Sequence, residues 1–173
     1  MNEYENIKVP SFLLKSSSED EYKKIACTSS VVDGDLAGVF KLSDLLNLFK
    51  YMINSNISTL YPEVAKDFGL KNQDLTLRIN AKKLSPFVRV FAPTYSISDS
   101  LFVNGFLNSS KRDVALTVEV DRFSTPAVKV EKFNFRLKSN SQKAVFNTKA
   151  QSLKINDATT FSNVTINNQA YKD

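Results

Sequence analysis

Histidine and tryptophan are absent from this sequence, and cysteine and glycine are scarce. Without histidine the chain cannot build a Ser-His-Asp triad or a Cys-His pair, and it offers no imidazole ligand to a metal. A single cysteine cannot close an internal disulfide or assemble a structural zinc site. Only four glycines occur, and neither glycine-rich phosphate-binding motif is present. These absences predict a protein that is not an enzyme and that uses no cofactor and no metal.

Long apolar runs are also missing. Residues 1–24 contain only a short apolar cluster, whereas a signal peptide needs about 7–15 apolar residues and a membrane span about 20. We therefore expect either a cytosolic protein or a segment of a longer chain. Residues 161–173 still alternate like a strand and contain no stop signal, which favours the segment. Residues 1–24 would then form an extension, and residues 25–173 a single domain.

The sequence before residue 42 predicts a hairpin. Asp33-Gly34 is flanked by β-branched residues, a pattern typical of a two-residue hairpin turn. The same stretch begins like a calcium loop, but its twelfth position is Asp44, which is too short to replace the usual bidentate glutamate. A plain turn is therefore the favoured interpretation.

Helical spacing follows, from residue 43 to about residue 68. Ser43 is a good N-cap, and apolar residues then recur at every third or fourth position, which predicts one apolar helical face. Pro62 can open a second short helix in this insert. A third short helix is predicted after the strand at residues 75–81, where Ser85 would be the cap and Pro86 the first helical residue.

The remainder of the chain alternates between apolar and polar residues. The five alternating runs span residues 101–108, 113–121, 127–137, 143–150 and 159–167. Such runs, separated by polar turns, predict a meandering antiparallel sheet. Within 127–137 the alternation changes phase, which predicts a bulge near Glu131-Lys132 and hence a bent sheet. The predicted fold class is mainly β (α+β): a curved, groove-like antiparallel sheet with two or three short helices packed on it.

Positive charge is concentrated after residue 110, where basic residues interleave with aromatic ones. Single-stranded nucleic acid stacks on surfaces of that kind. The alternation, however, places Phe133 and Phe135 on the opposite side from Arg136 and Lys138. A sheet with one apolar and one solvated face is therefore favoured, and no nucleic-acid partner is expected.

The apolar face of an open sheet must be covered by a helix, a partner or an apolar ligand. Seven residues of the later strands are predicted to share that face: Val103, Leu116, Val118, Val120, Phe133, Phe135 and Leu137. These residues are candidates to line a groove for an apolar ligand. Their alternation fits an ordinary core equally well, so the sequence leaves both interpretations open.

The order of these segments resembles the TamB/AsmA-like envelope proteins, the translocation and assembly module class, and most closely the long versions from Bacteroidetes-type bacteria. The resemblance covers most of the chain as loosely spaced positions. The matching residues are Gly38, Phe40, Tyr61, Pro62, Pro93, Ile97, Gly105, Leu107 and Asn108.

This resemblance implies a specific function. Family members are anchored in the inner membrane, cross the periplasm, and contain a taco-shaped sheet with an apolar interior. They are implicated in moving phospholipid towards the outer membrane, and some in assembling outer-membrane proteins with a barrel partner. The chain would thus be a periplasmic segment that contacts phospholipid acyl chains, neighbouring segments of its own chain and an outer-membrane β-barrel. The alternative is a structural or chaperone-like module that assists outer-membrane protein assembly or secretion.

Overall fold

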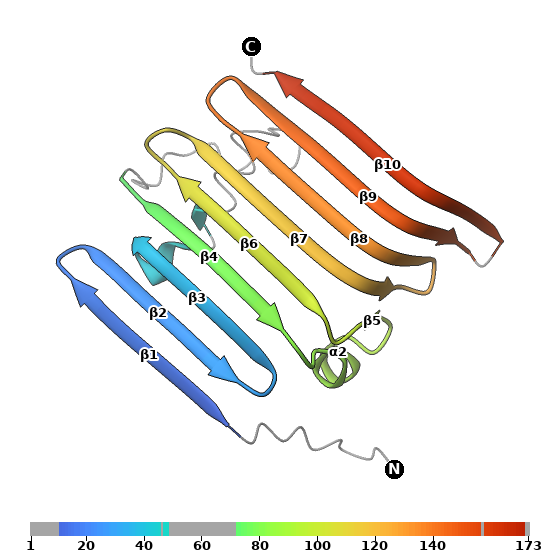
Figure 1. The fold of residues 1–173 in the computed structure, drawn as a ribbon, viewed down its shortest axis with the longest axis horizontal. Coiled ribbons are helices and arrows are strands. Elements are labelled where there is room, and N and C mark those ends of the chain that lie inside the picture. Colours follow the sequence, from blue (N-terminus) through green and yellow to red (C-terminus); the bar gives the residue numbers. More distant parts are fainter. Residues whose placement is uncertain (1–10, 46, 49–71, 157, 172–173) are drawn as a thin grey trace.

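A computed structural model describes residues 11–45, 47–48, 72–156 and 158–171. This part of the chain forms one open antiparallel sheet of ten strands, with β1 and β10 at its two edges (Figure 1). The strands are β1 Phe12–Glu19, β2 Tyr22–Ser29, β3 Val32–Val39, β4 Asp74–Ala81, β5 Ser96–Ile97, β6 Leu101–Asn108, β7 Asp113–Ser124, β8 Val128–Ser139, β9 Lys143–Ile155 and β10 Thr159–Tyr171. Their order is β1-β2-β3-β4-β6-β7-β8-β9-β10, and the short β5 pairs with the end of β7.

The described helical structure is limited to two short elements. The 3-10 turn η1 spans Leu42–Asp44 and continues into helical residues 45, 47 and 48, while α2 spans Ser85–Phe91. The described residues thus contain one α-helix, fewer than the predicted two or three, and residues 49–68 of the predicted insert lie outside them. Pro86 lies in the first turn of α2, but it is the second helical residue and not the first as predicted, because the helix begins at Ser85. Ser85 is not its cap, because Leu84 occupies the N-cap position and no side chain there forms a capping hydrogen bond. The backbone N–H of Ser85 instead donates to the carboxylate of Asp99 at 3.1 Å.

The sheet begins earlier in the chain than the sequence indicates. β1 pairs with β2 over eight residue pairs, so residues 12–24 belong to the sheet although we assigned residues 1–24 to an extension. The predicted turn at Asp33-Gly34 is wrong, because both residues lie inside β3. The turn falls just before β3, where the Ser29 hydroxyl accepts the backbone N–H groups of Val31 and Val32. Asp33 instead forms an ion pair with Lys82.

The ladder of β8 is interrupted at Lys132, next to the predicted bulge. Lys132 has a positive φ of 50°, and its pairing with both neighbouring strands is missing. On one side of the gap Val120 pairs with Phe133, and on the other Arg122 pairs with Glu131. The register is therefore unchanged, no extra residue is inserted, and the interruption is a left-handed residue rather than a bulge.

The register divides the side chains into an apolar face and a polar face. Directly opposed residues of antiparallel strands lie on the same side of the sheet, and successive residues alternate. One row across the apolar face consists of Leu36, Leu77, Gly105, Leu116, Leu137 and Phe146. The corresponding row of the polar face includes Asp35, Arg78, Asn104, Thr117, Arg136 and Asn147.

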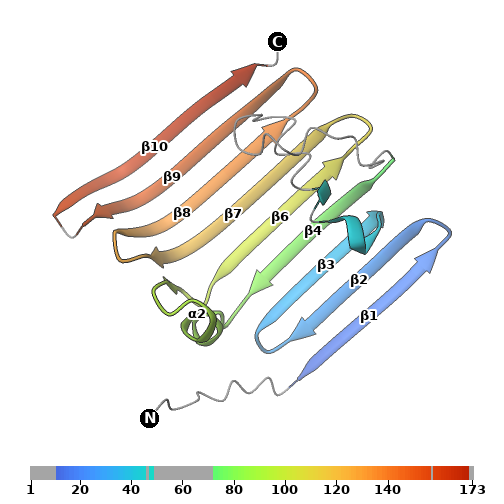
Figure 2. The same cartoon turned by 180° about the vertical axis from the view of Figure 1, so that it is seen from behind.

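The buried core lies at one end of the apolar face. Phe40, Leu48, Leu75 and Leu107 are at most 2% exposed and pack together. The helical residues 42–45, 47 and 48 include Leu48 and lie over β3 and β4, in front of the sheet in Figure 2. Figure 2 thus views the apolar face, and Figure 1 views the polar face.

Candidate functional site

All seven predicted groove residues lie on the apolar face. Val103 is opposite Val118 and Val118 is opposite Phe135, while Leu116 is opposite Leu137 and Val120 is opposite Phe133. The register therefore brings the side chains of β6, β7 and β8 into one contiguous surface. Because the rows run across the strands, this surface crosses the sheet from strand to strand.

The exposure of these residues varies along the face. Val120 and Leu137 are buried, whereas Phe135 and the other four remain half-buried. The rings of Phe135 and Phe146 lie 6.5 Å apart, so the aromatic surface continues onto β9. On β10, Ile166 lies in the same row as Phe135 and is 57% exposed. The apolar face is therefore accessible towards the β10 edge.

Several apolar-face residues were missed by the sequence analysis. Phe146 and Ile166 extend the face onto β9 and β10, and Phe12 and Leu14 extend it onto β1. The alternation in residues 143–150 contained the signal for Phe146. Phe12 and Leu14 had no comparable signal, because three serines follow them and only the pairing with β2 places them in the sheet.

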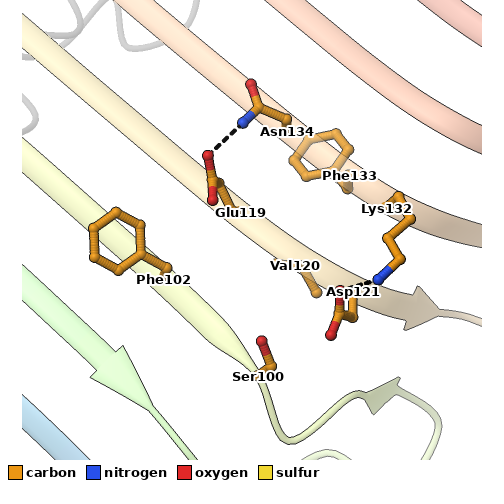
Figure 3. Close-up of a pocket in the computed structure, with 8 residues that line it drawn as sticks. All are labelled: Ser100, Phe102, Glu119, Val120, Asp121, Lys132, Phe133 and Asn134. Atoms are coloured by element: carbon orange, nitrogen blue, oxygen red, sulfur yellow. Dashed lines mark hydrogen bonds and ion pairs between the residues drawn. The ribbon is translucent and has the colours of Figure 1, made fainter.

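The polar face has a small pocket of about 260 Å³ between β6, β7 and β8 (Figure 3). Within it Asn134 donates a hydrogen bond to the Glu119 carboxylate at 2.7 Å, and Phe102 lies beside them. Lys132 Nζ lies 2.7 Å from the carboxylate of Asp121. That contact lowers the pKa of Asp121. Asp121 therefore stays ionised near neutral pH and is unsuited to donate a proton there.

In the described residues, no group of three or more Asp, Glu and Cys side chains is arranged to hold a metal ion. Within the same residues, no helix has the length and hydropathy of a membrane-crossing segment. The apolar face remains the most extensive feature to which a function can be assigned.

Comparison with known proteins gives no assignment. No family model, no curated protein and no solved structure matches the chain. The function therefore has to be argued from the two faces of the sheet.

Proposed function

We propose that the chain is a non-enzymatic segment of a TamB/AsmA-like periplasmic bridge that passes phospholipid through contact of acyl chains with its apolar face. The observation that carries this proposal is the contiguous apolar surface around Phe135 on a single-layered, open sheet. Groups that lie on this surface, such as Val118 and Phe135, offer apolar contacts and no reactive chemistry. Passive binding of apolar chains is the activity that such a surface supports.

The dimensions of the sheet suit this role. Neighbouring strands lie about 4.8 Å apart, so the eight intervals between β1 and β10 span roughly 38 Å. One acyl chain occupies half of a hydrocarbon core of about 30 Å, or roughly 15 Å. A chain laid across the strands would thus cover about three intervals. Each methylene group that an acyl chain buries contributes about 0.8 kcal/mol to binding. An acyl chain can move from one row of side chains to the next without a catalytic group.

A matched pair of substitutions tests the proposal. Val118 and Thr117 are adjacent, similar in size and both half-buried, but their side chains lie on opposite faces. Val118→Asn should weaken binding of a monomeric fluorescent fatty acid about fivefold, because roughly 1 kcal/mol of apolar contact is lost. Thr117→Asn should leave that affinity within twofold. Equal affinities for both variants, in chains with unchanged circular dichroism, would contradict acyl-chain binding on the apolar face.

The alternative, an assembly module, is favoured by the β10 edge. β10 is 13 residues long and contains no charged residue and no proline. Within the described residues it pairs only with β9. Natural edge strands usually carry lysine, proline or a bulge that prevents further pairing, so β10 could accept an added strand. Crosslinking of residue 166 to a nascent outer-membrane protein strand, without any lipid adduct on the apolar face, would support this second function.

A further inference from the structure

Four cations gather on the polar face of β8 and β9. Arg136 and Lys138 are on β8, and Lys143 and Lys149 are on β9; all four are exposed. Their register partners show that they share one side. Arg136 is opposite Thr117, Lys138 is opposite Ala115, Lys149 is opposite Asn134 and Lys143 is opposite Tyr171. We call these four residues the basic patch.

The basic patch is not neutralised within the described part of the chain. None of its four cations forms an ion pair there, in contrast to Lys132, which is bonded to Asp121. β9 and β10 contain no acidic residue, and the carboxylate of Glu119 already accepts a hydrogen bond from Asn134. The positive charge of the basic patch is therefore not compensated by ion pairs within the described residues.

A shallow hollow of about 450 Å³ adjoins the basic patch. Phe106, Ala115 and Val145 supply apolar walls, and Lys138 and Lys143 also line it. Asp113 is the one carboxylate among its lining residues. Apolar groups beside ammonium groups suit a ligand that is itself amphipathic and anionic, such as the headgroup and upper chain of an anionic phospholipid.

The distribution of aromatic residues argues against single-stranded nucleic acid as the partner. Nucleic-acid platforms combine cations with aromatic rings on the same surface. Here Phe133, Phe135 and Phe146 all lie on the apolar face, away from the basic patch. On the polar face, β8 and β9 carry no aromatic side chain. Phe106 on β6 and Tyr171 on β10 flank the basic patch on that face and do not interleave with its cations.

We infer that the basic patch docks the polar face of the sheet onto a membrane surface rich in anionic phospholipid. This inference rests on the proposed function only in taking phospholipid as the ligand class. The two interactions use opposite faces: the apolar face contacts acyl chains, and the basic patch contacts headgroups. Docking would hold the sheet at the membrane surface with its apolar face directed away from that surface.

Vesicle flotation of the 173-residue chain tests docking. Vesicles of phosphatidylcholine alone are compared with vesicles containing 30% phosphatidylglycerol, at about 0.05 M and 0.5 M salt. Because each surface cation contributes about a fivefold factor, Lys138→Gln/Lys149→Gln should weaken binding to anionic vesicles roughly 30-fold. The control, Lys15→Gln/Lys24→Gln, removes the same charge from the same face of β1 and β2 and should change binding less than threefold. High salt should release the wild-type chain.

Several outcomes would overturn the inference. Equal binding to both vesicle types, or equal weakening by the two double variants, would show that the basic patch is not the docking site. Binding of single-stranded DNA without binding of anionic vesicles would assign the patch to nucleic acid. Failure of the proposed function is distinguishable, because Val118→Asn should lose fatty-acid affinity and still float with anionic vesicles. The patch double variant should float poorly and still bind the fatty acid.

Discussion

Two parts of the same apolar face differ in what covers them. Around Leu75 and Leu107 the face is sealed, because Phe40 and Leu48 pack onto it. Around Phe135 and Ile166 the same alternating pattern leaves side chains half-buried or exposed. An alternating strand therefore specifies which face is apolar but not whether that face is core or binding surface. Substitutions that affect stability in the first part and binding in the second can separate the two roles.

The largest effect is expected in the sealed part. Leu75→Ala should lower the free energy of unfolding by about 3–5 kcal/mol, because Leu75 is 1% exposed and its removal leaves a cavity among packed side chains. Urea denaturation followed by circular dichroism measures this loss. A loss below about 1 kcal/mol would show that this end of the sheet is not a rigid core.

Gly38→Ala should cost somewhat less, about 2–4 kcal/mol. Gly38 has a φ of 138°, and a Cβ there would overlap the Asp74 carbonyl and lie 2.8 Å from Leu75 Cα. The matched control is Gly34→Ala in the same strand, where an added Cβ has no contact closer than 3.4 Å. Denaturation of both variants checks the difference, and similar stabilities would contradict the close β3–β4 approach at Gly38.

Phe135→Ala is expected to cost only about 1–2 kcal/mol. A buried phenylalanine loses about 3–5 kcal/mol on truncation, but Phe135 is half-buried and part of its ring surface is already hydrated. The same urea denaturation experiment measures the loss in free energy of unfolding for Phe135→Ala, which is then compared with the loss for Leu75→Ala. If the two losses are equal, the face around Phe135 is closed core and the comparison fails.

The smallest effect concerns pH. The hydrogen bond from Lys82 holds the pKa of Asp33 below its usual 3.8, so the folded state favours the ionised carboxylate. This stabilisation is present above pH 3.8 and is lost as the pH falls through the lowered pKa. Asp33→Asn should therefore make the pH dependence of stability shallower below pH 4, and Lys82→Met should have the same effect. Unchanged slopes in acid denaturation of both variants would exclude the contribution of this pair.

Much of the meander could be predicted from local alternation. β6 spans the predicted residues 101–108, and β7 to β10 contain the other four runs apart from one terminal residue. Some positions of the family resemblance also have structural reasons, since Gly38 permits close strand approach and Phe40 and Leu107 form core. These features depend on neighbouring residues, which a sequence pattern reports directly.

Other features depend on contacts between particular residues, and the sequence pattern does not predict which residues will be in contact. β1 was missed because its serine-rich sequence is held by pairing with β2. The β2–β3 turn was misplaced because the Ser29 hydroxyl, rather than Asp33-Gly34, fixes it. For the candidate site, alternation predicted the shared face of the seven residues, but their opposed pairs and their unequal exposure follow only from the assembled sheet.

Photocrosslinking in cells, in the full-length protein, tests the central claim most directly. A photoreactive amino acid at position 135 is compared with one at Asn104, an exposed polar-face position on β6 that lies two strands away. Our account predicts phospholipid adducts at position 135 and none at position 104. Protein adducts alone at position 135 would indicate the assembly role instead. Silence at position 135 in a folded, expressed variant would show that the face is closed core and would contradict lipid transfer by this segment.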